Sequence, residues 1–98
     1  MKYRITSKPH VKQDLQEALD YYKKISPKLA TEFLQRIREA KNRIAENPFA
    51  DDIMYKNIRM HIVSQFPYHI HYLTDENLKQ ITIIAIAFAK RDNLDFSK

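Results

Sequence analysis

The chain has 98 residues, enough for one domain built around one hydrophobic core. It contains no cysteine and no glycine, although average usage predicts about seven glycines in a chain of this length. The lack of glycine excludes the P-loop, the dinucleotide-binding fingerprint and the G-x-S-x-G nucleophile elbow, because each needs glycine backbone. The lack of cysteine excludes disulfide scaffolds, cysteine-based zinc sites and thiol nucleophiles.

The formal net charge is +5, and the excess lies in the first half of the chain. Residues 1–49 contain 11 basic and 6 acidic side chains, whereas residues 50–98 contain 6 of each. A basic excess permits a nucleic-acid or acidic protein partner, but a solvated helix surface is the simpler explanation. The sequence has no signal-peptide apolar stretch and no apolar run of membrane-helix length. We therefore expect a cytoplasmic protein with no membrane partner.

The first half of the chain predicts one short strand followed by two helices. Lys2 to Thr6 alternates basic and apolar residues, as a strand does. Ser7 is a candidate helix cap with Pro9 in the first turn, and Ser26-Pro27 repeats this arrangement for a second helix. Asn47-Pro48 ends the second helix, because the residue before proline avoids helical angles. The apolar stripes of the two helices are Val11, Leu15, Ala18, Leu19, Tyr22 and then Ala30, Phe33, Leu34, Ile37, Ile44, Ala45.

The second half predicts three strands. Residues 58–63 and 68–73 alternate in polarity, and Thr74 to Asn77 forms a turn without glycine. Gln80 to Ala89 is apolar on both faces, as expected of a central strand. The order β-α-α-β-β-β predicts an α+β fold, with an antiparallel twisted sheet and a helical hairpin packed on one of its faces. Residues 1–98 form a single domain in this interpretation.

The alternation also predicts which side chains the uncovered face of the sheet presents. If Met60 and its apolar neighbours point to the helices, then Arg59 and His61 point away from them. His69 and His71 point away by the same reasoning. We therefore expect one arginine and three histidines to gather on the open face, where they would suit a phosphate backbone or an acidic peptide.

Each of these residues also has a simpler interpretation. Arg59 could pair with a surface carboxylate, and Lys90-Arg91 could be an ordinary charged strand end. His69 and His71 are close enough in sequence to suggest a metal site, but no third ligand has matching spacing, so we expect no metal. They could instead be solvated strand residues or, with a pKa near neutrality, an acid or a base.

Several local strings occur together in this order: Asp14-Leu15, Ala18 and Tyr21-Tyr22; Ala30, Phe33-Leu34, Ile37, Ala40 and Ile44; Asn47-Pro48; Ile58-Arg59, Val63 and Phe66 to Tyr72; Ile84 to Ile86 and Lys90 to Asp92. In this combination the chain resembles the RelE/ParE superfamily of toxins from type II toxin–antitoxin systems, also called plasmid stabilisation proteins. The resemblance covers nearly the whole chain.

The resemblance implies a toxin that arrests growth, needs no cofactor and is held inactive in a hetero-oligomer with a cognate antitoxin. ParE-like members inhibit DNA gyrase, whereas RelE-like members cleave mRNA at the ribosome without a metal. The long helical hairpin and the Tyr21-Tyr22 pair favour the ParE-like activity. The alternatives are a RelE-like mRNA endonuclease and a non-toxic fold relative that acts as a binding module.

Under the nuclease alternative, the resemblance implies catalytic roles for four residues. Arg59 and Arg91 would be the cations that stabilise the crowded phosphate. His69 occupies the position at which nuclease members often carry a catalytic arginine, and His71 could transfer a proton.

Two phenylalanines argue against cleavage. Many nuclease-like relatives carry a histidine late in the last strand or a tyrosine near the C-terminus, where this chain has Phe88 and Phe96. A phenylalanine side chain cannot donate or accept a proton. For binding to gyrase, the ribosome or the antitoxin, we expect contributions from Arg59, His61, Lys90, Arg91 and Phe96.

Overall fold

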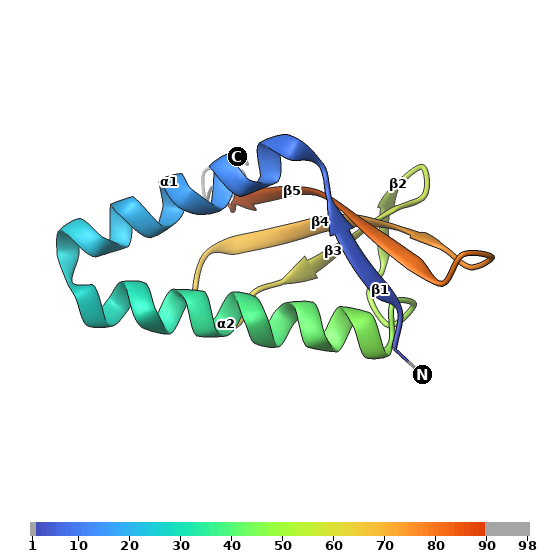
Figure 1. Ribbon diagram of the computed structural model, residues 1–98, viewed down its shortest axis with the longest axis horizontal. Helices are drawn as coiled ribbons and strands as arrows, with labels where there is room; N and C mark the ends of the chain where they lie inside the picture. The colour runs from blue at the N-terminus through green and yellow to red at the C-terminus, as the bar shows by residue number, and fades with distance from the viewer. Residues whose placement is uncertain (1, 90–98) are drawn as a thin grey trace, which may run out of the picture.

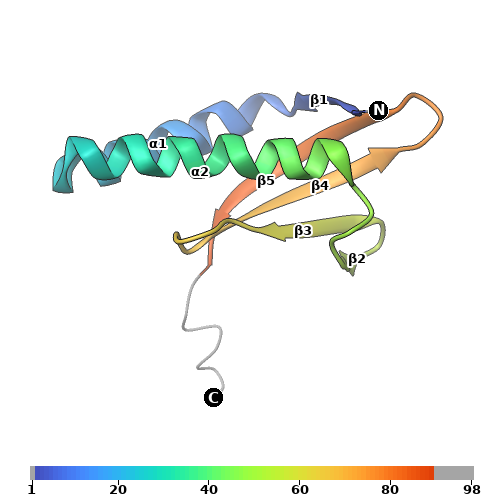
Figure 2. The ribbon, with the colours of Figure 1, turned by 90° about the horizontal axis from the view of Figure 1, so that it is seen from below.

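The computed structural model describes residues 2–89. Its elements follow the chain as β1 (Arg4–Ser7), α1 (Pro9–Ile25), α2 (Pro27–Glu46), β2 (Ile53–Tyr55), β3 (Ile58–Ile62), β4 (Tyr68–Asp75) and β5 (Gln80–Phe88). The strands form one sheet in the order β1-β5-β4-β3-β2, and the two helices lie side by side over one of its faces (Figures 1 and 2). The predicted α+β fold with a helical hairpin on one face is confirmed.

The sheet differs from the prediction in two respects. First, β1 pairs with β5 in parallel, so the sheet is mixed, whereas all other pairings are antiparallel. The strand that begins the chain therefore lies beside the strand that ends it, and β4 rather than β5 takes the middle position. Second, β2 was not predicted. All three of its side chains are exposed, so the alternation that marks a half-buried strand is missing from it.

The helix boundaries follow local chemistry. Ser26 is the N-cap of α2 and its hydroxyl oxygen accepts a hydrogen bond from the Leu29 amide at 3.4 Å, while Asn47 is the C-cap; both were predicted. The predicted cap of α1 is wrong. Ser7 belongs to β1, where it pairs with Ile83, and the cap residue is Lys8, whose side chain makes no capping hydrogen bond.

The turns are made without glycine. Three other residues, Lys56, Gln65 and Lys79, adopt positive φ angles of 52°, 70° and 54°. Each costs about 1 kcal/mol relative to glycine at the same position. The β4–β5 turn offsets part of this cost, because Oδ1 of Asp75 accepts hydrogen bonds from the Asn77 and Leu78 amides, both at 3.0 Å.

The core lies between the helical hairpin and the sheet and contains a cluster of aromatic rings. The Phe33 ring is centred 5.1–5.2 Å from the rings of Tyr22, Phe66 and Tyr68. Tyr22 is buried and its neighbour Tyr21 is exposed, so the second tyrosine of the pair packs in the core and the first lies at its rim. The other large, fully buried side chains are Ile37, Ile44, Val63, Ile70, Tyr72, Ile81 and Ile83.

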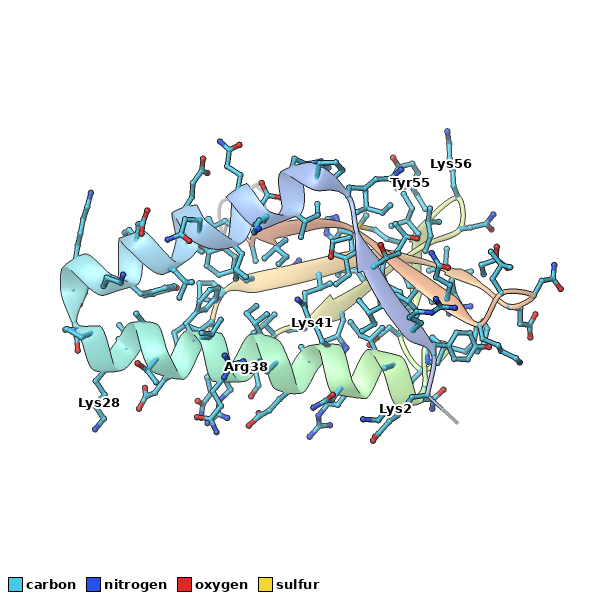
Figure 3. The ribbon with its side chains drawn as sticks, in the orientation of Figure 1. Lys2, Lys28, Arg38, Lys41, Tyr55 and Lys56 are labelled. Carbon is cyan, nitrogen blue, oxygen red and sulfur yellow. The ribbon has the colours of Figure 1, made fainter. Side chains whose placement is uncertain are left out.

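The basic side chains of the helical half lie largely in solvent. Lys28 and Arg38 on α2 are both exposed, and Lys28 extends away from the sheet in Figure 3. This agrees with the simpler explanation of the positive charge as a solvated helix surface. Tyr55 and Lys56 project from the β2–β3 turn in the same view. Neither helix within residues 2–89 has the length and apolar character needed to cross a membrane.

Candidate functional site

The pairing of β3 with β4 determines which side of the sheet carries each predicted site residue. Arg59 pairs with Tyr72 and His61 with Ile70, and directly paired residues project to the same face. Tyr72 and Ile70 are fully buried beneath the helices. Arg59 and His61 therefore project to the helix side of the sheet, and the predicted gathering of one arginine and three histidines on the open face is wrong.

The open face carries His69 and His71, as predicted. They lie two residues apart on β4, with ring centroids 6.4 Å from each other. Their cross-strand partners on β3 are Ile62 and Met60, and their partners on β5 are Ala87 and Ala85. The two histidines are thus set in an apolar surface rather than in a basic one.

Partial burial lowers the pKa of both open-face histidines. Burial is the cause for His69. For His71 burial is the larger cause, and repulsion from the charge of a protonated His69 is the smaller one. Both rings are therefore neutral at pH 7, which suits a hydrogen-bonding or proton-accepting role better than the binding of phosphate as cations.

The same shifts predict a pH dependence of stability. The folded-state pKa of each histidine is below the ordinary value of 6.5, so the unfolded chain binds more protons as the solution is acidified. Their contribution to stability is complete above about pH 7.5 and is lost as the pH falls through 6.5 towards the folded-state values. Urea titrations at several pH values should show a smaller loss on acidification in the variant carrying His69→Gln and His71→Gln. Identical dependence of stability on pH in the variant and the wild type would contradict the lowered pKa values of His69 and His71.

On the helix side, Arg59 and His61 belong to a polar cluster centred on Asp51, which we call the Asp51 cluster (Asp51, Arg59, His61 and Tyr72). The His61 Nδ1–H donates to Oδ2 of Asp51 at 2.8 Å, and the Tyr72 hydroxyl lies 2.9 Å from the same oxygen. The Tyr72 hydroxyl also donates to the carbonyl oxygen of Pro48 at 2.9 Å. Because a carboxylate only accepts, the contact with Asp51 places the proton of a neutral His61 on Nδ1.

Arg59 completes the Asp51 cluster. Its Nη1 donates to the Asp51 carbonyl oxygen at 2.6 Å, and its guanidinium carbon lies 5.2 Å from the centre of the Phe49 ring. Burial, and then the hydrogen bond to Asp51, raises the pKa of Tyr72 well above its ordinary value, so its hydroxyl stays protonated. The cluster fastens the loop 47–52, which follows α2, to β3 and β4. The Arg59 guanidinium is thus held inside the protein by the Asp51 carbonyl oxygen and the Phe49 ring.

Three predicted residues, Lys90, Arg91 and Phe96, lie outside the described residues. Their roles remain predictions. Within residues 2–89, no group of three or more histidine, aspartate and glutamate side chains is arranged to hold a metal ion.

The structure also contains a pocket between α1 and the end of β5, here called the α1–β5 pocket. The parallel pairing of β1 and β5 stops at Ser7 and Ile83, after which the chain turns into α1. From there α1 side chains reach the edge of β5: His10 donates through Nε2 to the Ile84 carbonyl at 2.6 Å, and Oδ2 of Asp14 accepts from the Ile86 amide at 3.4 Å. A cavity of about 400 Å³ lies beyond this point.

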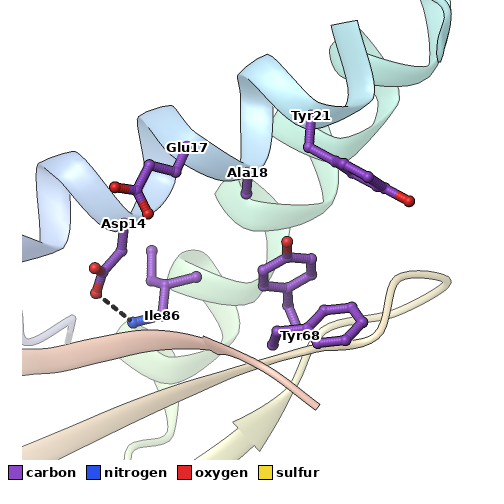
Figure 4. A pocket seen from close by; sticks show the side chains of 7 residues that line it. Asp14, Glu17, Ala18, Tyr21, Tyr68 and Ile86 are labelled. Atoms are coloured by element: carbon purple, nitrogen blue, oxygen red, sulfur yellow. Dashed lines mark hydrogen bonds between the residues drawn. The ribbon is translucent and has the colours of Figure 1, made fainter. Parts of the chain in front are cut away.

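The lining of the α1–β5 pocket combines carboxylates with aromatic rings. Its residues are Asp14, Glu17, Ala18, Tyr21, Tyr68, Ile86 and Phe88. In Figure 4, Asp14 and Glu17 extend from α1 on one side of Ala18, and Tyr21 lies further along the helix, towards Tyr68.

Sequence reasoning missed this pocket. Of the three acids on α1, Glu17 and Asp20 are exposed, whereas Asp14 is half-buried. The available signal was the spacing of residues 14, 17, 18 and 21, which places them on one helix face. The strand residues that complete the pocket are distant in sequence, so this spacing alone could not reveal a cavity.

Comparisons with known proteins agree with this fold. The chain is similar to the chromosomal ParDE toxin–antitoxin system from P. aeruginosa, with a TM-score of 0.77 and 17% identity over 91% of this chain and 98% of that one. It is also similar to the toxin–antitoxin complex RelBE2 from Mycobacterium tuberculosis, with a TM-score of 0.63 and 13% identity over 92% and 95% of the two chains. The archaeal RelE–RelB complex from Pyrococcus horikoshii gives a TM-score of 0.61 and 17% identity over 93% and 99%.

A search of curated protein sequences finds no match to this chain. The model of the family described as "ParE toxin of type II toxin-antitoxin system, parDE" matches residues 5–93, which is nearly the whole sequence. The match includes both helices, strands β2 to β5 and β1 from its second residue onward, and it agrees with the resemblance noted in the sequence. The chain belongs to the ParE toxin family of type II toxin–antitoxin systems.

Proposed function

We propose that this ParE-family toxin inhibits DNA gyrase and is neutralised by a cognate antitoxin. The observation that carries the proposal is the match of residues 5–93 to the ParE toxin family. Solved structures with the same fold are described as toxin–antitoxin systems or complexes, which supports an antitoxin as the physiological partner.

The geometry of the predicted catalytic residues supports gyrase over mRNA as the target. Metal-free cleavage of RNA needs a base, a cation and an acid around one phosphate. Arg59 projects to the helix side of the sheet, whereas His69 and His71 project to the open face. The Arg59 guanidinium is held by the Asp51 carbonyl and the Phe49 ring. These three candidates therefore cannot surround a single phosphate in this fold.

A supercoiling assay tests the proposed target. We expect purified toxin to inhibit the supercoiling of relaxed plasmid by gyrase, because inhibition requires only a protein–protein contact and no nuclease centre. The same toxin mixed beforehand with the product of the neighbouring antitoxin reading frame should leave gyrase active. Induction of the toxin alone should arrest growth of the bacterial host.

Primer extension on translated mRNA provides the opposing measurement. Codon-phased cuts with undisturbed supercoiling would establish the RelE-like activity and overturn the proposal. Full growth after induction would favour a non-toxic fold relative, and failure to recover an antitoxin would overturn the proposed partner.

A further inference from the structure

We propose that the α1–β5 pocket binds an arginine side chain presented by a protein partner. The inference rests on the chemistry of the pocket and is independent of whether gyrase is the target. Three features carry it: two carboxylates that have no basic partner among the described residues, aromatic rings at the rim, and an apolar floor.

The carboxylates of Asp14 and Glu17 lie on successive turns of α1 and both line the pocket. Oδ2 of Asp14 accepts from the Ile86 amide at 3.4 Å, and Oε2 of Glu17 accepts from the amide of Gln13 at 3.2 Å. Neither bond involves a cation, and among the described residues 2–89 no lysine or arginine lines the pocket. Within residues 2–89, the ion pairs are Arg36–Glu39 and His61–Asp51, so neither pocket carboxylate has a basic partner there. Within this part of the chain the two negative charges therefore lack a basic partner.

Aromatic rings form the other side of the pocket. The rings of Tyr68 and Phe88 are centred 5.4 Å apart and nearly perpendicular, at 70°. Tyr21 and Phe88 are 57% and 53% exposed, so large apolar surfaces remain accessible at the entrance. The faces of aromatic rings attract cations, and this attraction strengthens when the cation is partly removed from water.

Arginine fits this combination better than lysine or an uncharged side chain. Its planar guanidinium can stack on a tyrosine or phenylalanine ring and at the same time donate to carboxylate oxygens. Its methylene groups would cover Ala18 and Ile86 at the floor of the pocket (Figure 4). A lysine ammonium is more strongly hydrated and cannot stack, and an aliphatic side chain would bury the carboxylates without a partner.

Charge distribution indicates the kind of partner. The whole chain carries +5, so a basic partner would be repelled by most of its surface and attracted where the acids of α1 are concentrated. The pocket would therefore select one basic side chain of a partner segment rather than a generally basic surface. A short peptide with a single arginine can therefore stand in for the partner segment.

The test is an NMR titration of the full-length protein with two blocked tripeptides, Ala-Arg-Ala and Ala-citrulline-Ala. Citrulline has almost the same shape as arginine but no charge. We expect amide shifts confined to Ala18, Tyr21, Ile86 and Phe88, with the arginine peptide binding about tenfold more tightly than the citrulline peptide. The variant with Asp14→Asn and Glu17→Gln should lose this preference, because it removes both negative charges. It should still fold, because each amide keeps an oxygen that can accept the existing hydrogen bond.

Asp20→Asn is the matched control. It removes one negative charge from the same helix, but Asp20 does not line the pocket and accepts instead from Gln16 at 2.9 Å. This variant should keep the preference for arginine. Equal affinity for the two peptides, tighter binding of a leucine peptide, or no shift at concentrations of about 50 mM would each overturn the proposal. Concentration-dependent dimerisation that shifts the same amides without peptide would show that a second copy occupies the pocket, and would also overturn it.

Discussion

Replacing Phe33 by alanine is expected to lower the free energy of unfolding by about 3–5 kcal/mol. Phe33 is fully buried, and its ring contacts three other aromatic rings, those of Tyr22, Phe66 and Tyr68. Together with Phe33 of α2, these rings come from α1, from the segment that joins β3 to β4, and from β4 itself, so the cavity left by alanine would loosen the packing of the hairpin on the sheet. For a domain of this size, such a loss is a large part of the total stability.

Urea unfolding followed by circular dichroism measures this effect. Tyr55→Ala serves as the control, because it also removes an aromatic ring but from a side chain that is 55% exposed, and it should change stability by less than about 0.5 kcal/mol. The Phe33 variant should also fail to arrest growth, since the toxin would be largely unfolded. A loss below about 1 kcal/mol for Phe33→Ala would show that the aromatic cluster is not a principal source of stability.

The second large effect concerns the Asp51 cluster. Asp51→Ala should lower the free energy of unfolding by about 1–3 kcal/mol, because it removes the acceptor for His61 and one of the two acceptors for the fully buried Tyr72. The side chains of His61 and Asp51 are only 16% and 23% exposed, so water cannot fully replace the lost contact. The neighbouring variant Asp52→Ala removes an exposed carboxylate from the same loop and should have little effect.

A double-mutant cycle separates the tyrosine contact from the rest of the Asp51 cluster. Tyr72→Phe removes only the hydroxyl, and its effect should be smaller when Asp51 is already alanine. Additive losses would mean that the 2.9 Å contact between the Tyr72 hydroxyl and Asp51 contributes nothing to stability.

The elements that were predicted correctly are those with local signals. The helices were recognisable because their apolar residues recur at helical spacing, and the boundaries at Ser26-Pro27 and Asn47-Pro48 follow from the stereochemistry of proline and the capping hydroxyl. The three strands predicted in the second half alternate in polarity or are continuously apolar. Either pattern can be recognised from the residues of the strand alone. Ser7 was misassigned as a cap because pairing with β5 extends β1 through it, and a pairing partner more than seventy residues away leaves no local signal.

Local sequence patterns were not sufficient to predict the candidate site. Alternation divides the residues of β3 into two sets, but it does not state which set faces the helices. The sequence predicts that the set containing Met60 faces the helices, because apolar residues are usually buried. In the fold, the helix side of β3 is covered by the loop 47–52, and Asp51 of that loop supplies hydrogen bonds for Arg59 and His61. The polar set can therefore face inward, and the apolar set surrounds His69 and His71 on the open face.

The sequence by itself thus determined the succession of elements, the two helix faces that form the core, and the likeness to a toxin family. Each of these depends on residue spacing and on the order of local strings. Only the tertiary structure decided the parallel β1–β5 pairing, the inward orientation of Arg59 and His61, and the α1–β5 pocket. Each of these depends on which distant segment lies opposite a residue. Asp14 and Glu17 on α1 line one pocket with Tyr68 and Phe88 because β1 stops pairing where α1 begins, and that pocket exists only once the helical hairpin has packed on the sheet.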